Sequence, residues 1–214
     1  MPEAFGSAGF GGFGLDHLPY GVYSVADGVR RVATRLGDTV IDLAGALAGR
    51  VADADELFAT HTLNRFLAAG QERWVEVRST LQEILAEPVP AAVQHPLAAV
   101  RLHRPVDFAD YVDFYASEHH ATNLGRLFRP DAAEPLLPNW KHLPVSYHGR
   151  AATIVESGVD IIRPCGQRLL PGEDVPTFGP CQRLDIEAEL GFIVGTPTAM
   201  GTRITPDDAD RHLF

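Results

Sequence analysis

The chain has few cysteines, and this narrows the classes of protein to which it can belong. Its 214 residues include only Cys165 and Cys181, which stand 16 positions apart with no third cysteine to join them. This pattern favours two ordinary free thiols over a metal site, a catalytic cysteine or a disulfide scaffold. Free thiols are typical of a reducing compartment, so we expect a cytoplasmic protein.

Basic residues and long apolar runs are also scarce. The chain has 18 Lys and Arg against 28 Asp and Glu, a formal charge of −10, which argues against nucleic acid as a partner because phosphate binding needs clustered basic side chains. No segment approaches the roughly 20 apolar residues of a membrane span, and the glycine-rich start around Glu3 does not have the apolar core of a secretory signal. We therefore expect neither nucleic acid nor a membrane as a partner.

A dinucleotide fingerprint is present in letters only. Gly9 to Gly14 read GFGGFG, but the motif needs a strand before it and a helix after it to hold a phosphate. Here Pro19 follows closely, and seven residues of mixed character precede the match beyond Met1. We interpret the segment as an N-terminal arm.

Short β-rich runs open the ordered part of the sequence. Residues 21–25, 29–36 and 39–43 are rich in β-branched side chains, and Asp27-Gly28 and Gly37-Asp38 between them are typical hairpin turns. A small antiparallel meander or barrel is expected here.

A helix is predicted over residues 70–86. Apolar side chains recur there at three- and four-residue spacing, and Trp74 belongs to this stripe, so we expect Trp74 in the core. Pro88 and Pro90 end the helix. The proline-rich stretch that follows indicates a domain border near Pro105, which divides the chain into residues 1–104 and 105–214.

The second half predicts more strands and then a helix. Residues 153–155, 160–162 and 184–194 alternate in polarity or carry β-branched side chains. Thr205-Pro206-Asp207-Asp208 is a strong helix start, and only six residues follow it, up to Phe214. We expect a chain that is truncated or a domain that is incomplete.

Asp113, Tyr115 and His120 allow two local structures. In one continuous helix Tyr115 would lie roughly 200° around the axis from Asp113, so the three side chains could not enter one pocket. If the chain is instead extended through Tyr115, Asp113 and Tyr115 share a face. Ser117 would then cap a later helix with His120 in its first turn. The residues alone leave both alternatives open.

Three acids share one face of the expected strand over residues 184–194. Asp185, Glu187 and Glu189 alternate there with apolar side chains. Two carboxylates at positions i and i+2 can converge on a hard cation such as Ca²⁺ or Mg²⁺, although a solvated acidic face is the plain alternative. Arg129, Arg150, Tyr147 and His148 are either surface residues or donors to an anionic ligand.

At this point the sequence resembles the fumarylacetoacetate hydrolase family. The segments that carry the resemblance are Asp113-Phe114-Tyr115, His120-Ala121-Thr122-Asn123, Pro138-Asn139-Trp140, residues 143–150 (LPVSYHGR) and residues 184–189 (LDIEAE). It extends back to residues 17–22 (HLPYGV) and 62–64 (TLN), and so covers nearly the whole chain. The resemblance implies a mainly β fold with some α. Its parts are a small SH3-like barrel domain and then the first part of a mixed β-roll catalytic domain.

The resemblance also implies a role for seven residues. Asp113, Glu187 and Glu189 are expected to bind a divalent cation, Ca²⁺ or Mg²⁺, and His120 is expected to be the general base. The substrate contacts implied are Tyr115, Arg129 and Tyr147. His119 receives no role, because only His120 is followed by the Ala-Thr-Asn of the family pattern.

The implied reaction is hydrolysis of fumarylacetoacetate to fumarate and acetoacetate, the last step of tyrosine and phenylalanine catabolism, by an enzyme that is a homodimer when complete. Cleaving a 1,3-diketone with water needs a base, a Lewis acid for the diketo oxygens and donors for the substrate carboxylates. In the family a further aspartate ligand, further substrate contacts and a carboxylate that assists the histidine would follow Phe214. We therefore expect the 214 residues to be inactive alone. The alternatives are a related acylpyruvate or diketone hydrolase, or an inactive metal- or anion-binding fragment.

Overall fold

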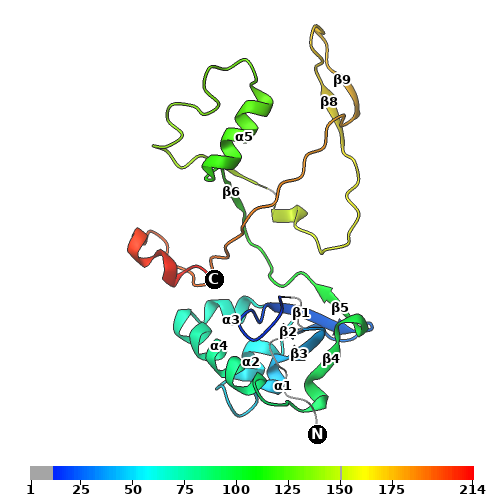
Figure 1. The fold of residues 1–214 in the computed structure, drawn as a ribbon, viewed down its shortest axis with the longest axis vertical. Helices are drawn as coiled ribbons and strands as arrows, with labels where there is room; N and C mark the ends of the chain where they lie inside the picture. Colours follow the sequence, from blue (N-terminus) through cyan, green and yellow to red (C-terminus); the bar gives the residue numbers. More distant parts are fainter. Residues whose placement is uncertain (1–11, 150) are drawn as a thin grey trace. The chain divides into compact units, whose positions relative to one another are not determined.

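The computed structural model describes residues 12–149 and 151–214, which form two compact units. Unit 1 comprises Met1–Val106 and Glu156–Phe214, and unit 2 is Asp107–Val155. Gly9 to Gly11 of the glycine motif lie outside the described residues. The described chain is a mixed α/β structure, drawn in Figure 1.

A five-stranded antiparallel sheet forms the centre of unit 1, in the order β4-β3-β2-β1-β5. The predicted meander is confirmed, because its three β-rich runs form consecutive neighbouring strands joined at the two predicted turns. The strands are β1 (Tyr20–Val25), β2 (Arg31–Leu36), β3 (Thr39–Asp42), β4 (Gln94–Pro96) and β5 (Val100–His103).

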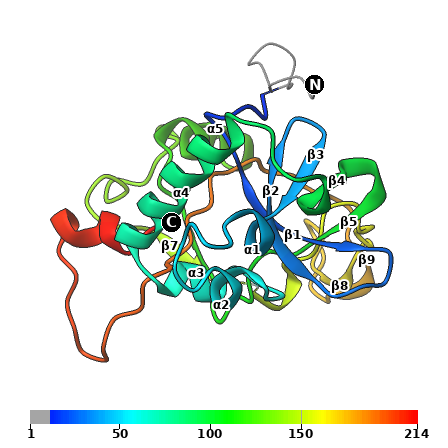
Figure 2. The same ribbon diagram turned by 90° about the horizontal axis from the view of Figure 1, so that it is seen from below.

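Helices α1 to α4 lie along one side of this sheet (Figures 1 and 2). They are α1 (Leu43–Ala46), α2 (Ala54–Phe58), α3 (Asn64–Ala68) and α4 (Gln71–Leu85). Helix α4 confirms the predicted helix over residues 70–86, and it buries the stripe Trp74, Val77, Leu81 and Leu85. Trp74 is 7% exposed and its Nε1–H donates to the carbonyls of Phe66 and Leu67. Its predicted place in the core is confirmed.

Asp42 connects the sheet to the first helix. It ends β3, and its Oδ1 accepts the N–H of Gly45, 2.8 Å away, which caps α1. Its Oδ2 accepts from Arg31 Nε at 2.5 Å and from the Tyr23 hydroxyl at 3.0 Å. Burial by itself would raise the pKa of Asp42, but the Arg31 guanidinium, the Gly45 N–H and the Tyr23 hydroxyl together hold that pKa below its usual value.

The second portion of unit 1 begins at a hydrogen-bonded contact with β5. The Glu156 carboxylate accepts a hydrogen bond from Arg101 at 3.1 Å and lies 3.2 Å from Nδ1 of His103. The second ring nitrogen of His103, Nε2, lies 2.8 Å from the hydroxyl oxygen of Ser24. The bond from Arg101, and then that with His103, lowers the pKa of Glu156. These contacts join the start of the second portion to His103, which lies three positions before Val106, the last residue of the first portion.

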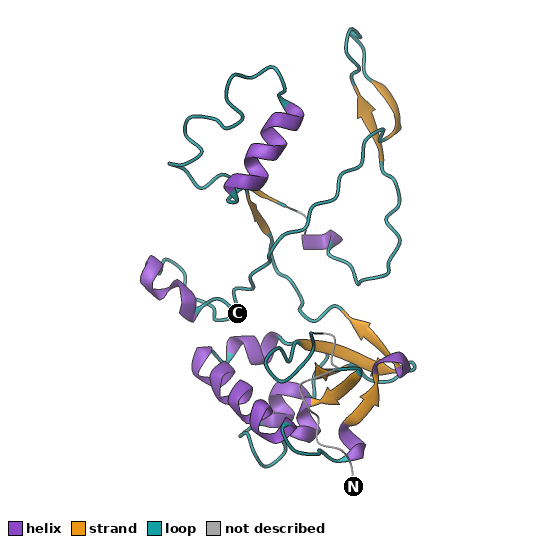
Figure 3. Cartoon of the chain, in the orientation of Figure 1, coloured by secondary structure: helices purple, strands orange, loops and turns teal. Residues whose placement is uncertain are grey.

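The second portion has fewer strands than the sequence predicts. Figure 3 draws residues 156–214 mostly as loop, apart from the hairpin of β8 (Cys165–Arg168) and β9 (Thr177–Pro180) and the helix near the C-terminus. The strand predictions over 153–155, 160–162 and 184–194 are wrong: Ala151–Thr153 is a 3-10 turn, and the other segments join no ladder beyond one bridge at Val194. A strand needs a neighbouring backbone to pair with, and none of the described residues supplies one to these segments.

The last residues pack against the helices of unit 1. Ile193 and Phe214 exchange two backbone hydrogen bonds, and the Phe214 ring lies 5.2 to 5.7 Å from the rings of Tyr20, Phe66 and Trp74. The predicted helix start is confirmed in position but not in type, because Pro206–Arg211 is a 3-10 helix. No helix among the described residues is both long and apolar enough to cross a membrane.

Candidate active site

Unit 2 contains a short antiparallel pair with Asp113 at its centre. Strand β6 (Val112–Phe114) pairs with β7 (Ser146–His148) so that Asp113 lies opposite Tyr147. The Tyr147 hydroxyl donates to Asp113 Oδ2 at 2.7 Å, and the Tyr111 hydroxyl donates to the same oxygen at 3.3 Å. The backbone is thus extended at Asp113, which decides between the two alternatives that the residues left open.

His120 lies in the first turn of helix α5 (Glu118–Phe128). Ser117 precedes the helix with extended backbone, and its side-chain oxygen accepts the N–H of His120 at 3.4 Å. The predicted Ser117 cap is confirmed. His120 is partly buried, and its ring meets that of Tyr115 edge to face at 6.3 Å.

Tyr115 and Arg129 both donate to backbone carbonyls of unit 2. The Tyr115 hydroxyl donates to the Ala121 carbonyl at 2.8 Å, and Arg129 donates to the Pro135 carbonyl at 2.7 Å. The Pro135 carbonyl lies against Gly125, where an added Cβ would clash with that oxygen. Only glycine therefore allows this loop to approach the helix, and it is this approach that lets Arg129 reach the loop.

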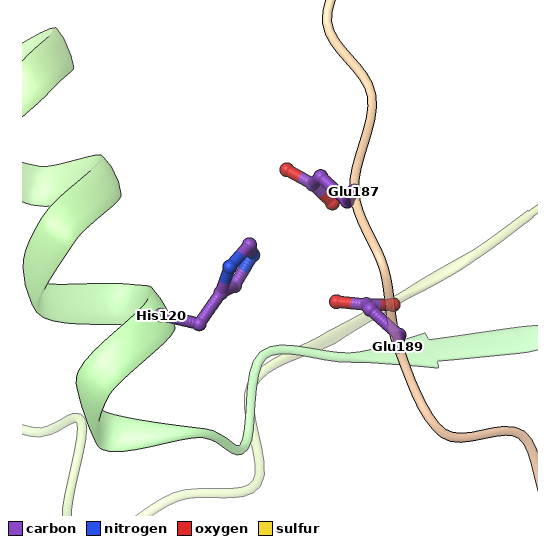
Figure 4. Close-up of side chains that lie close together, drawn as sticks. All are labelled: His120, Glu187 and Glu189. Carbon is purple, nitrogen blue, oxygen red and sulfur yellow. The ribbon is translucent and has the colours of Figure 1, made fainter.

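Glu187 and Glu189 lie in unit 1, on the extended segment that follows β9. A carboxylate oxygen of one lies within 4.8 Å of a carboxylate oxygen of the other, and Figure 4 shows both side chains leaving the same side of the segment. Two of the three acids predicted to share a face, Glu187 and Glu189, therefore do so although the ladder is not present. The apolar side chains that alternate with these acids are exposed to solvent, Ile186 to 94% and Leu190 to 87%.

The remaining histidines and arginines of the inventory have other surroundings. His148 contacts Asp110, and this hydrogen bond, with the Tyr111 N–H, lowers the pKa of Asp110. His119 is exposed on α5, and Arg150 lies outside the described residues.

Unit 2 also contains a cavity of about 470 Å³. Its lining includes Phe114, Tyr115, Trp140 and Leu143, with Glu118 and Lys141 forming an ion pair of 2.8 Å. Phe114 faces the opposite side of β6 from Asp113, since side chains alternate along a strand. Tyr115, two residues after Asp113, also lines the cavity, so side chains from both faces of this extended segment contribute to it.

The oxygen donors that the sequence singled out fit a hard divalent cation. Asp113, Glu187 and Glu189 are carboxylates, the ligands that Ca²⁺ and Mg²⁺ prefer, and two of them have oxygens within 4.8 Å of one another. Sequence reasoning did not single out Tyr111, although the period of two along an extended chain places it on the face of Asp113 and Tyr115. That signal was available in the letters Y-V-D-F-Y.

Both halves of the chain match profiles of one known protein family. The family profile described as Fumarylacetoacetase N-terminal matches residues 16–105, and that described as Fumarylacetoacetate (FAA) hydrolase C-terminal matches residues 110–214. The chain is 39% identical over 219 residues to the fumarylacetoacetase of Caenorhabditis elegans, 40% over 218 to that of Arabidopsis thaliana, and 38% over 216 to that of Homo sapiens.

These alignments cover the chain and its relatives unequally. Each includes 94% of this chain but only 52%, 51% and 51% of the respective relative. The chain thus spans about half the length of the curated relatives it matches.

Proposed function

The chain belongs to the fumarylacetoacetate hydrolase family, and on that premise we propose that it contributes to a metal-dependent hydrolase that cleaves fumarylacetoacetate into fumarate and acetoacetate. One observation carries the proposal. Asp113 and Tyr147, 34 residues apart, are joined by a 2.7 Å hydrogen bond across paired strands. The resemblance assigns one of these residues to the metal and the other to the substrate, so both roles require them on one face.

Asp113, Glu187 and Glu189 would hold the cation, Ca²⁺ or Mg²⁺, through carboxylate oxygens. When bound, the cation supplies a Lewis acid that polarises the diketo oxygens of the substrate. The charge of the cation would also offset the repulsion between the neighbouring carboxylates of Glu187 and Glu189.

His120 would be the general base that takes a proton from the attacking water, a role that suits histidine near neutral pH. Helix α5 supports this role by presenting the imidazole from its capped first turn. Arg129 would bind the substrate carboxylates as a guanidinium donor. Tyr115 and Tyr147 would contact the substrate as well, and to donate to it each would turn its single O–H away from the Ala121 carbonyl or from Asp113 Oδ2. Arg129 donates to Pro135 through one terminal nitrogen, and a guanidinium carries further N–H donors.

The finer architecture belongs to the same proposal. We propose an SH3-like barrel for residues 1–104, the first part of a β-roll catalytic domain for residues 105–214, a homodimeric enzyme, and the cytoplasm as its compartment. The two family profiles, which match residues 16–105 and 110–214, support this division.

Turnover of fumarylacetoacetate by a fusion of residues 1–214 to the second half of the Arabidopsis relative tests the function. We expect the fusion to be active and residues 1–214 alone to be inactive. In the fusion, His120→Ala should lower kcat by about 10²- to 10⁴-fold while cation binding is retained. His119→Ala is the matched control, because the imidazole of His119 is exposed and has no proposed role.

Three results would redirect the proposal. An unchanged rate in His120→Ala would remove the base assignment. Faster turnover of an acylpyruvate than of fumarylacetoacetate would favour the related hydrolase. A native protein of 23.2 kDa in its source cells, together with an inactive fusion that still binds the cation, would favour a binding module.

A further inference from the structure

Two tyrosines, not one, donate to the carboxylate of Asp113. Tyr147 reaches Oδ2 from the opposite strand at 2.7 Å, and Tyr111 reaches the same oxygen at 3.3 Å from two residues earlier in the chain. Tyr147 has a proposed role in substrate binding, whereas Tyr111 has none so far. Both hydroxyls meet at one carboxylate oxygen.

The ring of Tyr111 is held by packing. A Cβ added to Gly149 would lie 2.7 Å from one carbon of the Tyr111 ring and 2.9 Å from another. The N–H of Gly149 also donates to the Tyr111 carbonyl at 3.2 Å. The ring of Tyr111 thus lies against the backbone of Gly149, in space that a side chain at that residue would fill.

Two donors on one oxygen restrict how the carboxylate can rotate and bind. Residues that hydrogen-bond a metal ligand fix its orientation and tune its affinity for the ion. Both hydrogen bonds shown to Asp113 are accepted by Oδ2. Oδ1, which accepts neither of them, is therefore the oxygen better placed to bind a cation. We propose that Tyr111 is a positioning residue that, with Tyr147, holds Asp113 as a one-oxygen ligand for a divalent cation. This inference rests on the proposed function, which makes Asp113 a cation ligand.

Calorimetric titration of the chain with Ca²⁺ and with Mg²⁺ tests the role. Tyr111→Phe keeps the ring against Gly149 and removes only the hydroxyl, and it should raise the dissociation constant about 10-fold. Tyr20→Phe, which removes a hydroxyl from β1 of unit 1, is the matched control and should bind as the unsubstituted chain does. Asp113→Asn should lose binding.

A spectroscopic measurement needs no substitution. The chain has five tyrosines, so labelling each at ¹³Cζ gives few signals to assign. Saturating cation should move the signals of Tyr111 and Tyr147 and leave those of Tyr20 and Tyr23 in place. If Tyr111→Phe does not fold, as judged by near-ultraviolet circular dichroism, this titration decides alone.

The outcomes separate this inference from the function on which it rests. Wild-type affinity in Tyr111→Phe beside lost binding in Asp113→Asn overturns the role of Tyr111 and leaves the cation site standing. An unmoved Tyr111 signal at saturation does the same. If neither the unsubstituted chain nor its fusion to the second half of the Arabidopsis relative binds either ion, the cation site of the proposed function fails, and the role of Tyr111 fails with it.

Discussion

Asp42 in unit 1 and Asp113 in unit 2 are both carboxylates that accept hydrogen bonds from tyrosine. Asp42 is 6% exposed and receives Tyr23, the Gly45 N–H and the guanidinium of Arg31. Asp113 is partly exposed, and the donors the structure shows for it, Tyr111 and Tyr147, are neutral phenols. One aspartate has a cationic side chain as partner, and the other has donors that orient it.

This difference indicates what each carboxylate is for. A buried charge that already has a cation and a helix N-terminus is satisfied, and its removal affects the fold. A carboxylate that is oriented by phenols and has no ion pair among the described residues can accept a cation from outside. We therefore expect Asp42 to control stability and Asp113 to control cation binding.

The largest expected effect is that of Asp42→Ala on stability. The substitution leaves the buried Tyr23 hydroxyl without its acceptor, removes the N-cap of α1 and frees Arg31, so the free energy of unfolding should fall by roughly 3 kcal/mol. Urea unfolding measures it. Asp38→Ala is the control, because Asp38 is 95% exposed in its pair with Arg35 and should change stability by less than about 0.5 kcal/mol. A similarly small loss for both would refute the structural role of Asp42.

Asp113→Asn should have the next largest effect, but only when cation is present. At about 100 times the dissociation constant a ligand adds roughly 2.7 kcal/mol to stability, and the variant should lose that increment while matching the unsubstituted chain in chelator. Thermal unfolding with and without Ca²⁺ measures both. Asp131→Asn, at an exposed acid of the same unit, should retain the increment. An equal loss for Asp113→Asn in chelator would make Asp113 a structural residue like Asp42.

The pH dependence of stability should also distinguish Asp42. Its folded pKa is lowered from an ordinary value of 3.8, so its contribution is fully present above that value and is lost as pH falls through the folded pKa. The stability difference between the unsubstituted chain and Asp42→Asn should therefore shrink below about pH 4. Urea unfolding over the acid range measures it, and a constant difference throughout that range would contradict the assignment.

Tyr115→Phe should have the smallest effect. The substitution removes one hydrogen bond, from the Tyr115 hydroxyl to the Ala121 carbonyl at 2.8 Å, and should lower stability by about 1 kcal/mol. Cation affinity should stay unchanged, because the bonds to Asp113 come from other tyrosines. A loss of cation affinity in this variant would mean that Tyr115 also helps to place the carboxylate.

Several local structures could be predicted because their causes are local. The hairpin turns, the stripe of α4 and the Ser117 cap depend on residues within a few positions of one another. The common face of Glu187 and Glu189 follows from extended backbone alone, so it is present even where no ladder forms. The strands predicted over 160–162 and 184–194 failed because pairing depends on a distant segment, which alternation cannot supply.

By itself the sequence determined which residue types could act on a cation and a dicarboxylate, and the family to which their order belongs. The tertiary structure decided which of these residues meet. Asp113 and Tyr147 are brought together by strand pairing, and Arg129 reaches Pro135 only because Gly125 allows a close approach. Composition and spacing describe residues that are near one another in the sequence, whereas hydrogen bonds and packing join residues that are far apart in it. The candidate chemical groups could therefore be predicted from the sequence, but their contacts could not.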